Sequence, residues 1–259
     1  MYCVIPTLKR LLNNENISVE NRKCVKNFIG IAEDIEKMKY EENTKDIKLI
    51  NIINGFNDKI IVFTKYKTTI KFLEKLLKQN DYKTAVFYGG MTRKEKENQI
   101  EYFKKEARIL LSTEAGGEGR NLQFCNAMVN YDLPWNPMAI EQRIGRIHRV
   151  GQKRDVHIFN LAAKDTIESY ILDILDKKIN MFELVVGEVD MILGDLSEED
   201  NGFDDAVMDI WANSQDKGDL ERKMGELGDK LLDKRNQYTK VKDVDEKIFG
   251  NLFKAGENK

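Results

Sequence analysis

Three arginines of this chain stand three residues apart, and the chemistry that this spacing serves best is the binding of an anion. Arg143, Arg146 and Arg149 lie within the segment 142–152. If the segment is helical, the spacing places the three guanidinium groups in a nearly aligned row. Each guanidinium stays charged and can hold a phosphate or a carboxylate at two points. The row therefore predicts an anion site, with an exposed, salt-bridged helix face as the alternative.

The distribution of arginine along the chain favours the anion site. The chain has 42 basic residues, most of them Lys, yet several arginines fall between positions 120 and 154. These are Arg120, Arg143, Arg146, Arg149 and Arg154. A Lys-rich chain that concentrates arginine in one region indicates a need for the planar, two-point grip there.

A second segment combines hydroxyl side chains with glycines. Ser112 and Thr113 end an apolar run and are followed by Gly116, Gly117 and Gly119. A strand that ends in hydroxyls and continues through glycines offers hydroxyl groups and unobstructed backbone amides to a phosphate. A glycine-rich turn alone is weak evidence, because most such turns only reverse the chain.

Short apolar strands and amphipathic helices alternate from Lys59 onward and would position these segments. Strands are expected at residues 60–63, 84–88, 109–112, 127–131 and 156–160, and helices at 69–77, 92–103 and 138–147. Apolar strands separated by helices indicate βαβ units, and thus an α/β fold with a parallel sheet covered on both faces. Right-handed crossovers place the loops after the strands along one edge of the sheet, where ligands bind in such folds.

The flanking parts of the chain are expected to be helical. The predicted organisation is a helical N-terminal extension at 1–57, the α/β lobe at 58–163, bracing helices at 164–194, and an acidic linker with C-terminal helices at 195–259. Within the last part, residues 195–209 are expected to form the linker and residues 220–253 one or two charged helices.

Charge is distributed unevenly, although the net charge is only −2. Residues 59–152 contain 17 Lys and Arg against 10 Asp and Glu, whereas residues 195–221 contain 10 acidic residues and a single basic one, Lys217. The middle of the chain is therefore suited to a polyanion, and the acidic segment is not.

Composition argues against several other classes of protein. The chain has 259 residues, 41% of them hydrophobic, which is enough for a sizeable core, and no apolar run approaches the roughly 18 residues of a membrane span. The three cysteines are far apart and only two histidines are present, so a cysteine metal cage is excluded and zinc hydrolase chemistry is not expected. We expect a reducing, intracellular compartment, no metal site and no membrane partner.

The motifs resemble those of superfamily 2 helicases. Residues 142–152 are similar to motif VI of these enzymes, and residues 111–123 to motif V of the Swi/Snf-type branch. Residues 132–137 match the strand-end signature of that branch, residues 59–66 are similar to motif IV, and residues 88–92 to the segment after it. All occur in family order, and the resemblance is strongest to the branch of the bacterial ATPase that recycles RNA polymerase.

The resemblance implies a RecA-like lobe, the second of two, in an ATP-driven translocase on double-stranded DNA. In the family, the second and third arginines of motif VI act as arginine fingers on ATP, and they match Arg146 and Arg149. The matching nucleotide-facing residues are Gln142, Gly117, Glu118 and Gly119. The matching contacts to nucleic-acid phosphates are Thr64, Lys65, Gly89, Gly90, Thr113 and Arg120.

The resemblance also implies what another lobe must supply. The sequence has no G-x-x-x-x-G-K-[ST] loop and no early acidic pair for a metal, so ATP and Mg²⁺ are expected to be held mainly by a first lobe. This chain alone is therefore predicted to be inactive. The implied partners are double-stranded DNA, the N-terminal RecA-like lobe of the same protein, and RNA polymerase or another DNA-bound protein, in the cytoplasm and at the nucleoid if the source is bacterial.

Two alternatives remain open. An RNA helicase lobe of the DEAD-box type is disfavoured, because that group begins motif VI with His-Arg, whereas this chain has Gln142-Arg143, and because its motif V has Asp in place of the glycine pair. A module that binds nucleic acid or a polymerase without catalysing any reaction would carry the same basic surface.

Overall fold

The computed structural model describes residues 5, 8, 9, 12, 19–36, 44–113, 122–148, 152, 154–181, 188–193 and 202–256. The chain divides into two compact units. The first consists of Met1–Leu133 and Arg143–Leu161, and the second of Pro134–Gln142 and Ala162–Lys259.

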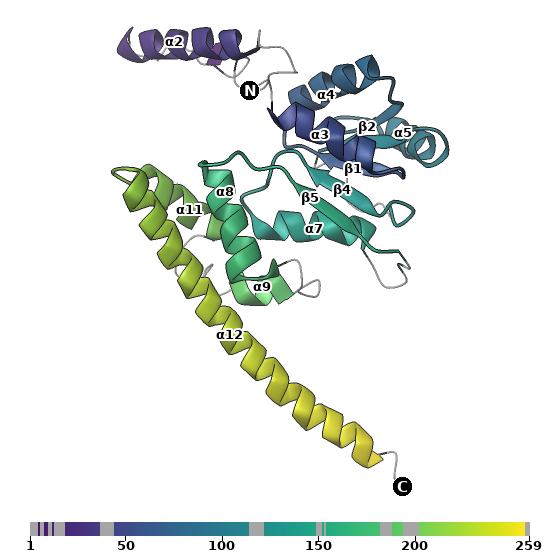
Figure 1. Ribbon diagram of the computed structural model, residues 1–259, viewed down its shortest axis with the longest axis vertical. Helices are drawn as coiled ribbons and strands as arrows, with labels where there is room; N and C mark the ends of the chain where they lie inside the picture. Colours follow the sequence, from purple (N-terminus) through teal and green to yellow (C-terminus); the bar gives the residue numbers. More distant parts are fainter. Residues whose placement is uncertain are drawn as a thin grey trace. The chain divides into compact units, whose positions relative to one another are not determined.

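The first unit is built on the predicted parallel sheet. Its strands are β1 (Ile60–Phe63), β2 (Thr84–Phe87), β3 (Ile109–Ser112), β4 (Ala127–Asn130) and β5 (His157–Asn160). All neighbouring pairs are parallel, in the order β2-β3-β1-β4-β5 (Figure 1). The five strands expected from the sequence are confirmed to within one residue at each end.

Helices cover both faces of this sheet because successive side chains of each strand point to opposite faces. In β1, Ile60 and Val62 join a core that includes Leu49 and Ile53 of helix α3 (Thr44–Gly55). Apolar residues of α4 (Lys67–Gln79) belong to the same core. Helices α3 and α4 thus cover one face of the sheet, as the predicted α/β fold requires.

The other face of the sheet has its own core. Ile61 and Phe63 of β1 pack with Phe103 of α5 (Arg93–Lys105) and with Ile147 at the end of α7 (Pro137–Ile147). Helix α5 begins with a capping box: the Thr92 hydroxyl accepts from the Glu95 amide, and the Glu95 carboxylate accepts from the Thr92 amide. Such a cap fixes the point at which the chain leaves the loop after β2.

The N-terminal part contains helix α2 (Val19–Glu36) before α3. The two helices differ in their role within the unit. Leu49 and Ile53 of α3 are fully buried against the strands, so α3 is part of the core of the lobe. In α2, Phe28 and Ile31 are exposed.

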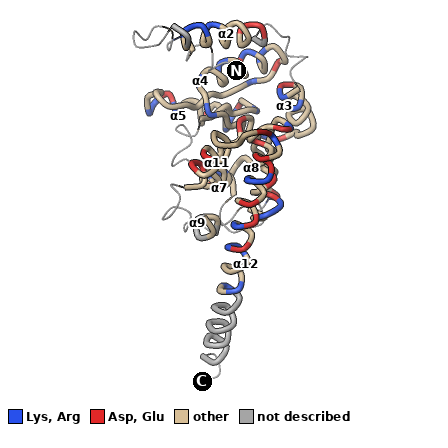
Figure 2. Tube along the Cα trace, turned by 90° about the vertical axis from the view of Figure 1, so that its left-hand side faces the viewer, with Lys and Arg blue, Asp and Glu red and all other residues tan. Residues whose placement is uncertain are grey.

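The second unit is helical, with α8 (Ile167–Asp173), the π-helical turn η2 (Ile174–Lys178), α9 (Glu188–Leu193), α11 (Phe203–Ala212) and α12 (Lys217–Gly256). Helix α12 contacts η2, α9 and α11 through a buried stripe of Met224, Leu227 and Leu231. Acidic and basic residues are interspersed along the described part of this helix (Figure 2). Of the one or two charged helices expected within 220–253, the structure has one, which runs from Lys217 to Gly256.

Part of the segment expected to be an acidic linker is helical. Residues 195–201 lie outside the described part of the chain, but helix α11 already begins at Phe203. Phe203 and Val207, four residues apart, are both buried, and this apolar pair stabilises a helix where the acidic composition indicates a linker. Among the described residues, no helix combines the length and apolar character that a membrane span requires.

Candidate functional site

Arg143, the first arginine of the row, is directed into the protein. Only 3% of its surface is exposed. Its Nη1 donates to Oδ1 of Asn130 at 2.6 Å and to the carbonyl of Asp132 at 3.2 Å, and its guanidinium carbon lies 5.1 Å from the ring centre of Phe63. A buried guanidinium with these partners holds α7 to the ends of β1 and β4 and is not available to a ligand.

Arg146, one turn later, differs from Arg143. It is partly exposed, and its carbonyl accepts a 3.2 Å hydrogen bond from the Leu122 amide. Its guanidinium makes no hydrogen bond or ion pair with any residue in the described ranges, so its charge is available to an external anion. Arg143 and Arg146, which the spacing suggests to be equivalent, thus differ: Arg143 is buried and bound to the sheet, and the charge of Arg146 is available. Arg149 lies outside the described residues.

Thr64, expected as a phosphate contact, uses its hydroxyl inside the protein. It is fully buried at the end of β1 and donates to Oδ2 of Asp132. The same carboxylate oxygen accepts from the Lys65 amide at 3.2 Å, and Lys45 of α3 lies 4.0 Å from the other oxygen. Asp132 therefore fixes the turn after β1, while the side chain of Lys65 is exposed beside it.

The turn after β2 contains the two predicted glycines. Gly89 and Gly90 are exposed, and Gly90 has a φ of 90°, which side chains disfavour. The turn leads directly to Thr92, the N-cap of α5. The ammonium of Lys67 lies 4.2 Å from the ring centre of Tyr88, so a second lysine is held beside this turn.

Thr113 follows β3, and its amide donates to the Phe87 carbonyl at 3.0 Å. Its hydroxyl is buried and has no hydrogen-bond partner among the described residues. The other candidates of this segment, Gly117, Glu118, Gly119 and Arg120, lie outside the described residues. Gln142, in the second unit, is exposed on α7.

The strand register brings the described candidates of the first unit to one edge of the sheet. Phe63 pairs with Ser112, and Ser112 pairs with Phe87, so the residues that follow these three lie side by side. They include Thr64, Lys65, Gly89, Gly90 and Thr113. Asn130 aligns with Phe63 from the other side, and Arg143 is bound to it at the same edge.

Sequence reasoning assigned no role to the residues that support this edge. Asn130 is fully buried and donates to Oδ1 of Asn160 at 2.7 Å while it accepts from Arg143. Asp46 of α3 is also buried and accepts from the Tyr131 hydroxyl at 2.6 Å. Desolvation raises the pKa of the Asp46 carboxyl above its ordinary value, although the Tyr131 hydrogen bond and Lys45 oppose the shift. A signal existed for Asn130, which is the polar residue at the end of an otherwise apolar strand.

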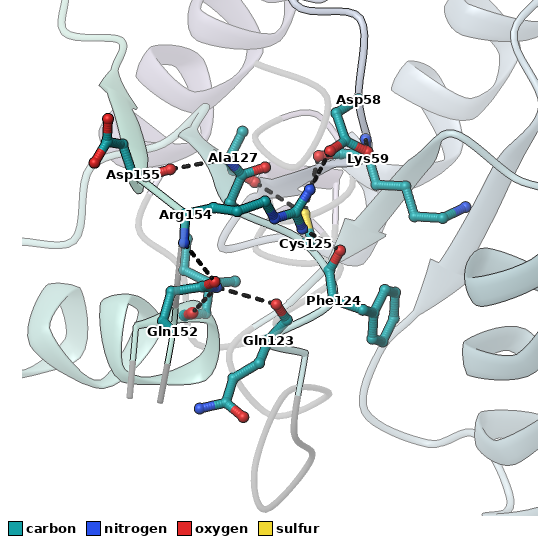
Figure 3. Close-up of polar contacts among 11 residues, drawn as sticks. Asp58, Lys59, Gln123, Phe124, Cys125, Ala127, Gln152, Arg154 and Asp155 are labelled. Atoms are coloured by element: carbon teal, nitrogen blue, oxygen red, sulfur yellow. Dashed lines mark hydrogen bonds and ion pairs between the residues drawn. The ribbon is translucent and has the colours of Figure 1, made fainter. Parts of the chain in front are cut away.

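Arg154 belongs to the opposite edge, where the strands begin. It pairs with Asp58, just before β1, and its Nη2 donates to the Phe124 carbonyl at 2.6 Å (Figure 3). Arg154 thus uses its planar guanidinium on a carboxylate and a carbonyl within the protein. Cys125 nearby is buried in the core, and desolvation raises the pKa of its thiol to about 12.

Comparison with known proteins identifies the lobe. The family described as helicase conserved C-terminal domain matches residues 44–151, which include every strand except β5 and begin at α3. Residues 44–151 thus form a helicase C-terminal domain. Within the described ranges, the structure places no group of three or more His, Cys, Asp or Glu side chains where they could hold a metal ion.

This chain is also similar to two longer bacterial proteins. The uncharacterized ATP-dependent helicase YqhH of Bacillus subtilis is 47% identical over 186 residues, which are 72% of this chain and 33% of that protein. The RNA polymerase-associated protein RapA of Vibrio campbellii is 39% identical over 130 residues, which are 49% of this chain and 13% of RapA. The chain thus spans a third or less of these relatives.

A solved structure resembles the fold. The C-terminal part of the Fun30 ATPase domain aligns with a TM-score of 0.50 and 22% identity, covering 66% of this chain and 63% of that one. The RecA-like fold expected from the motifs is thereby confirmed.

Proposed function

We propose that this chain acts as the second motor lobe of a Swi/Snf-type, ATP-dependent translocase on double-stranded DNA. The observation that carries the proposal is the contrast between Arg143 and Arg146 on one helix. Arg143 is buried and hydrogen-bonded to the sheet, whereas the guanidinium of Arg146 has no partner among the described residues. An anchored helix that presents an unused guanidinium is the arrangement that an arginine finger requires.

In this proposal the first lobe holds ATP and Mg²⁺, and this chain closes over the phosphates. Arg146 and Arg149 neutralise the charge that grows on the γ-phosphoryl oxygens as the phosphoryl group is transferred. Gln142 and residues 117–119 face the rest of the nucleotide. The Bacillus subtilis relative is named as an ATP-dependent helicase, which supports the use of ATP.

The DNA-binding part of the proposal concerns the carboxyl edge of β1, β2 and β3. Lys65, Gly89 and Gly90 are exposed there and suit the phosphates of a duplex backbone. Thr64 shapes this surface through Asp132 rather than contacting DNA with its hydroxyl. Thr113 and Arg120 are proposed as further phosphate contacts from the glycine-rich segment.

The substrate in the cell would be a DNA-bound protein, with RNA polymerase as the first candidate. This choice rests on the name of the RapA relatives, which are RNA polymerase-associated. We propose no direct polymerase contact on this chain.

The experiment that tests the function compares the isolated chain with a chimaera. In the chimaera, this chain replaces the matching segment of the Bacillus subtilis relative, whose remainder supplies the first lobe. The isolated chain is expected to hydrolyse no ATP, and the chimaera is expected to hydrolyse it with stimulation by duplex DNA. Turnover of about 1 to 100 s⁻¹ by the isolated chain would refute the assignment as a second lobe.

The same comparison decides between the alternatives. Stimulation by RNA rather than by duplex DNA would favour an RNA helicase lobe. DNA binding by a folded chimaera without any DNA-stimulated hydrolysis would favour a non-catalytic binding module.

A further inference from the structure

Gln152 makes three hydrogen bonds with the backbone at the end of helix α7. Its Nε2 donates to the carbonyls of Ile147 and Gln123, each at 3.0 Å, and its Oε1 accepts from the Arg154 amide at 3.2 Å (Figure 3). The side chain is half-buried. Both N–H groups and the oxygen of this amide are thus directed at backbone groups of three segments.

These bonds join two segments that matter for the proposed chemistry. Ile147 is the last residue of α7, and the carbonyls at a helix end have no partner within the helix. Gln123 follows the glycine-rich segment that comes after β3. One residue earlier in each segment, the Leu122 amide donates to the Arg146 carbonyl at 3.2 Å. Leu122 is therefore bound directly to Arg146, and Gln123 is linked to Ile147 through the side chain of Gln152.

The connection is fastened to the sheet by Arg154. The Arg154 amide donates to Oε1 of Gln152. Its guanidinium donates to the Phe124 carbonyl and forms an ion pair with Asp58, just before β1. Gln152 consequently lies between a site fixed on the sheet and the end of the helix that carries Arg146. A movement of either segment relative to the other must break or reorient the hydrogen bonds of Gln152.

We propose that Gln152 is a positioning residue for Arg146: it sets the place of the end of α7 relative to the segment that follows the glycine-rich loop. This inference rests on the proposed role of Arg146 as an arginine finger. The guanidinium of Arg146 has no side-chain partner in the described ranges to hold it. Its reach toward a phosphate is therefore set by its backbone, and the side chain that fixes this backbone from outside the helix is Gln152. A displacement of about 1 Å at a reacting centre costs on the order of 100-fold in rate.

The test uses two variants of Gln152 and one matched control. Gln152→Glu keeps the length of the side chain and the acceptor for Arg154 but replaces the donating Nε2. Gln152→Met removes the polar group without adding charge. The control is Asn126→Asp, because Nδ2 of Asn126 also donates to a backbone carbonyl, that of Asp155 at 2.8 Å, in the same part of the unit. Asn126 is the more buried residue, so this control should cost at least as much stability.

The first measurement is amide hydrogen exchange in the isolated chain, which depends on no catalytic role. Both Gln152 variants are expected to accelerate exchange of the Leu122 amide, which donates to Arg146, whereas Asn126→Asp leaves it unchanged. Unchanged exchange at Leu122 in both Gln152 variants would show that Gln152 does not hold this junction, and would overturn the inference.

The second measurement is DNA-stimulated ATP hydrolysis by the chimaera. Both Gln152 variants should lower kcat by about 10- to 100-fold while the KM for ATP and the affinity for DNA stay within about two-fold. A merely structural role would instead lower kcat in proportion to the loss of folded protein, as in Asn126→Asp. A kcat within two-fold of the parent in both Gln152 variants overturns the inference.

The double variant Gln152→Met with Arg146→Lys separates this inference from the proposed function. If Gln152 acts through Arg146, the double variant has the kcat of Arg146→Lys alone. If Arg146→Lys has a large effect and Gln152→Met adds its full effect to it, the positioning role fails and the finger remains. If Arg146→Lys alone leaves kcat unchanged, the proposed function of Arg146 fails first.

Discussion

Arg143 donates a 2.6 Å hydrogen bond from Nη1 to Oδ1 of Asn130, and this contact gives the first arginine of the row a different role from the second. Asn130 is fully buried at the end of β4 and donates in turn to Asn160 at the end of β5. Helix α7 is thereby bound to the carboxyl edge of the sheet one turn before Arg146.

The anchoring role of Arg143 predicts a loss of stability on substitution. Arg143→Lys keeps the charge but cannot reproduce the planar contacts with Asn130 and the Asp132 carbonyl. We expect the free energy of unfolding of the isolated chain to fall by about 1.5 to 3 kcal/mol, the usual value of hydrogen bonds to a charged group. Chemical denaturation measures this change. The control is Arg93→Lys, at an exposed ion pair with Glu97, where the change should stay within about 0.5 kcal/mol. Equal effects at both positions would contradict the anchoring role.

DNA binding by the isolated chain should be weak and dependent on salt. Lys65 lies at the proposed backbone surface, so Lys65→Ala should reduce the steepness of the plot of log K against log salt by about 0.9, the loss of one phosphate contact. The comparison uses titrations of duplex DNA between about 50 and 200 mM salt. Lys78→Ala, in the last turn of α4, is the matched control and should leave the slope unchanged. If Lys65→Ala and Lys78→Ala show the same slope of log K against log salt, the DNA does not bind at the surface around Lys65.

Asp46 predicts a pH dependence of stability. Because burial raises the pKa of its carboxyl, the folded state disfavours the charged form. Ionisation of this buried carboxyl therefore lowers the stability of the folded state. The loss of stability is absent at pH values below the ordinary pKa of 3.8 and grows as pH rises from there through the raised pKa. Asp46→Asn removes this titration and keeps an oxygen for the Tyr131 hydroxyl. The melting temperature of the variant relative to the parent protein should therefore rise between about pH 4 and pH 7. A difference that does not change with pH would show that this carboxyl carries no such cost.

Asp219 predicts a dependence of the opposite sign. The hydrogen bond from Lys223, with that from the Gln215 amide, lowers the pKa of its carboxyl from 3.8 to about 2. The stability that this carboxylate contributes is present above 3.8 and is lost as pH falls through about 2. Asp219→Asn should lower the melting temperature of the second unit at neutral pH, by an amount that shrinks on acidification below about pH 4. A deficit that persists unchanged at about pH 2 would contradict this account.

Two glycines of α12 give a packing prediction. A Cβ at Gly225 would meet nothing within 4 Å, whereas a Cβ at Gly228 would lie 3.3 Å from Ile174 Cγ1 and from Lys178 Cγ of η2. Gly225→Ala should raise the free energy of unfolding by about 0.5 to 1 kcal/mol through helix propensity. Gly228→Ala should raise the free energy of unfolding by less than Gly225→Ala does, because the close contact of the new Cβ with η2 offsets part of the gain in helix propensity. If Gly228→Ala is the more stabilising variant in denaturation, α12 does not pack closely on η2.

The sheet could be predicted from the sequence because each strand has an apolar centre between polar turns, and burial of the central strands β1, β3 and β4 on both faces selects that pattern. The carboxyl-edge location of Lys65, Gly89 and Gly90 followed from the parallel order. The start of α11 at Phe203 could not be predicted, because its stabilising contact is a pair of apolar residues within an acidic segment. Nor could the spacing of the arginines show that Arg143 is buried, since that depends on Asn130 from a strand 13 residues earlier. The same reason applies to Arg154, whose partner Asp58 is 96 residues away.

The central claim, that this chain supplies arginine fingers to ATP held by another lobe, is tested most directly by kcat of the Arg146→Lys chimaera with saturating ATP and duplex DNA. A lysine ammonium cannot form the planar two-point grip on the γ-phosphoryl group. The account predicts that kcat falls by about 10³ to 10⁵, the range known for arginine fingers, while the melting temperature and the affinity for DNA stay close to those of the parent chimaera. Arg149→Lys should behave in the same way. Near-normal kcat in the Arg146→Lys chimaera would contradict the account.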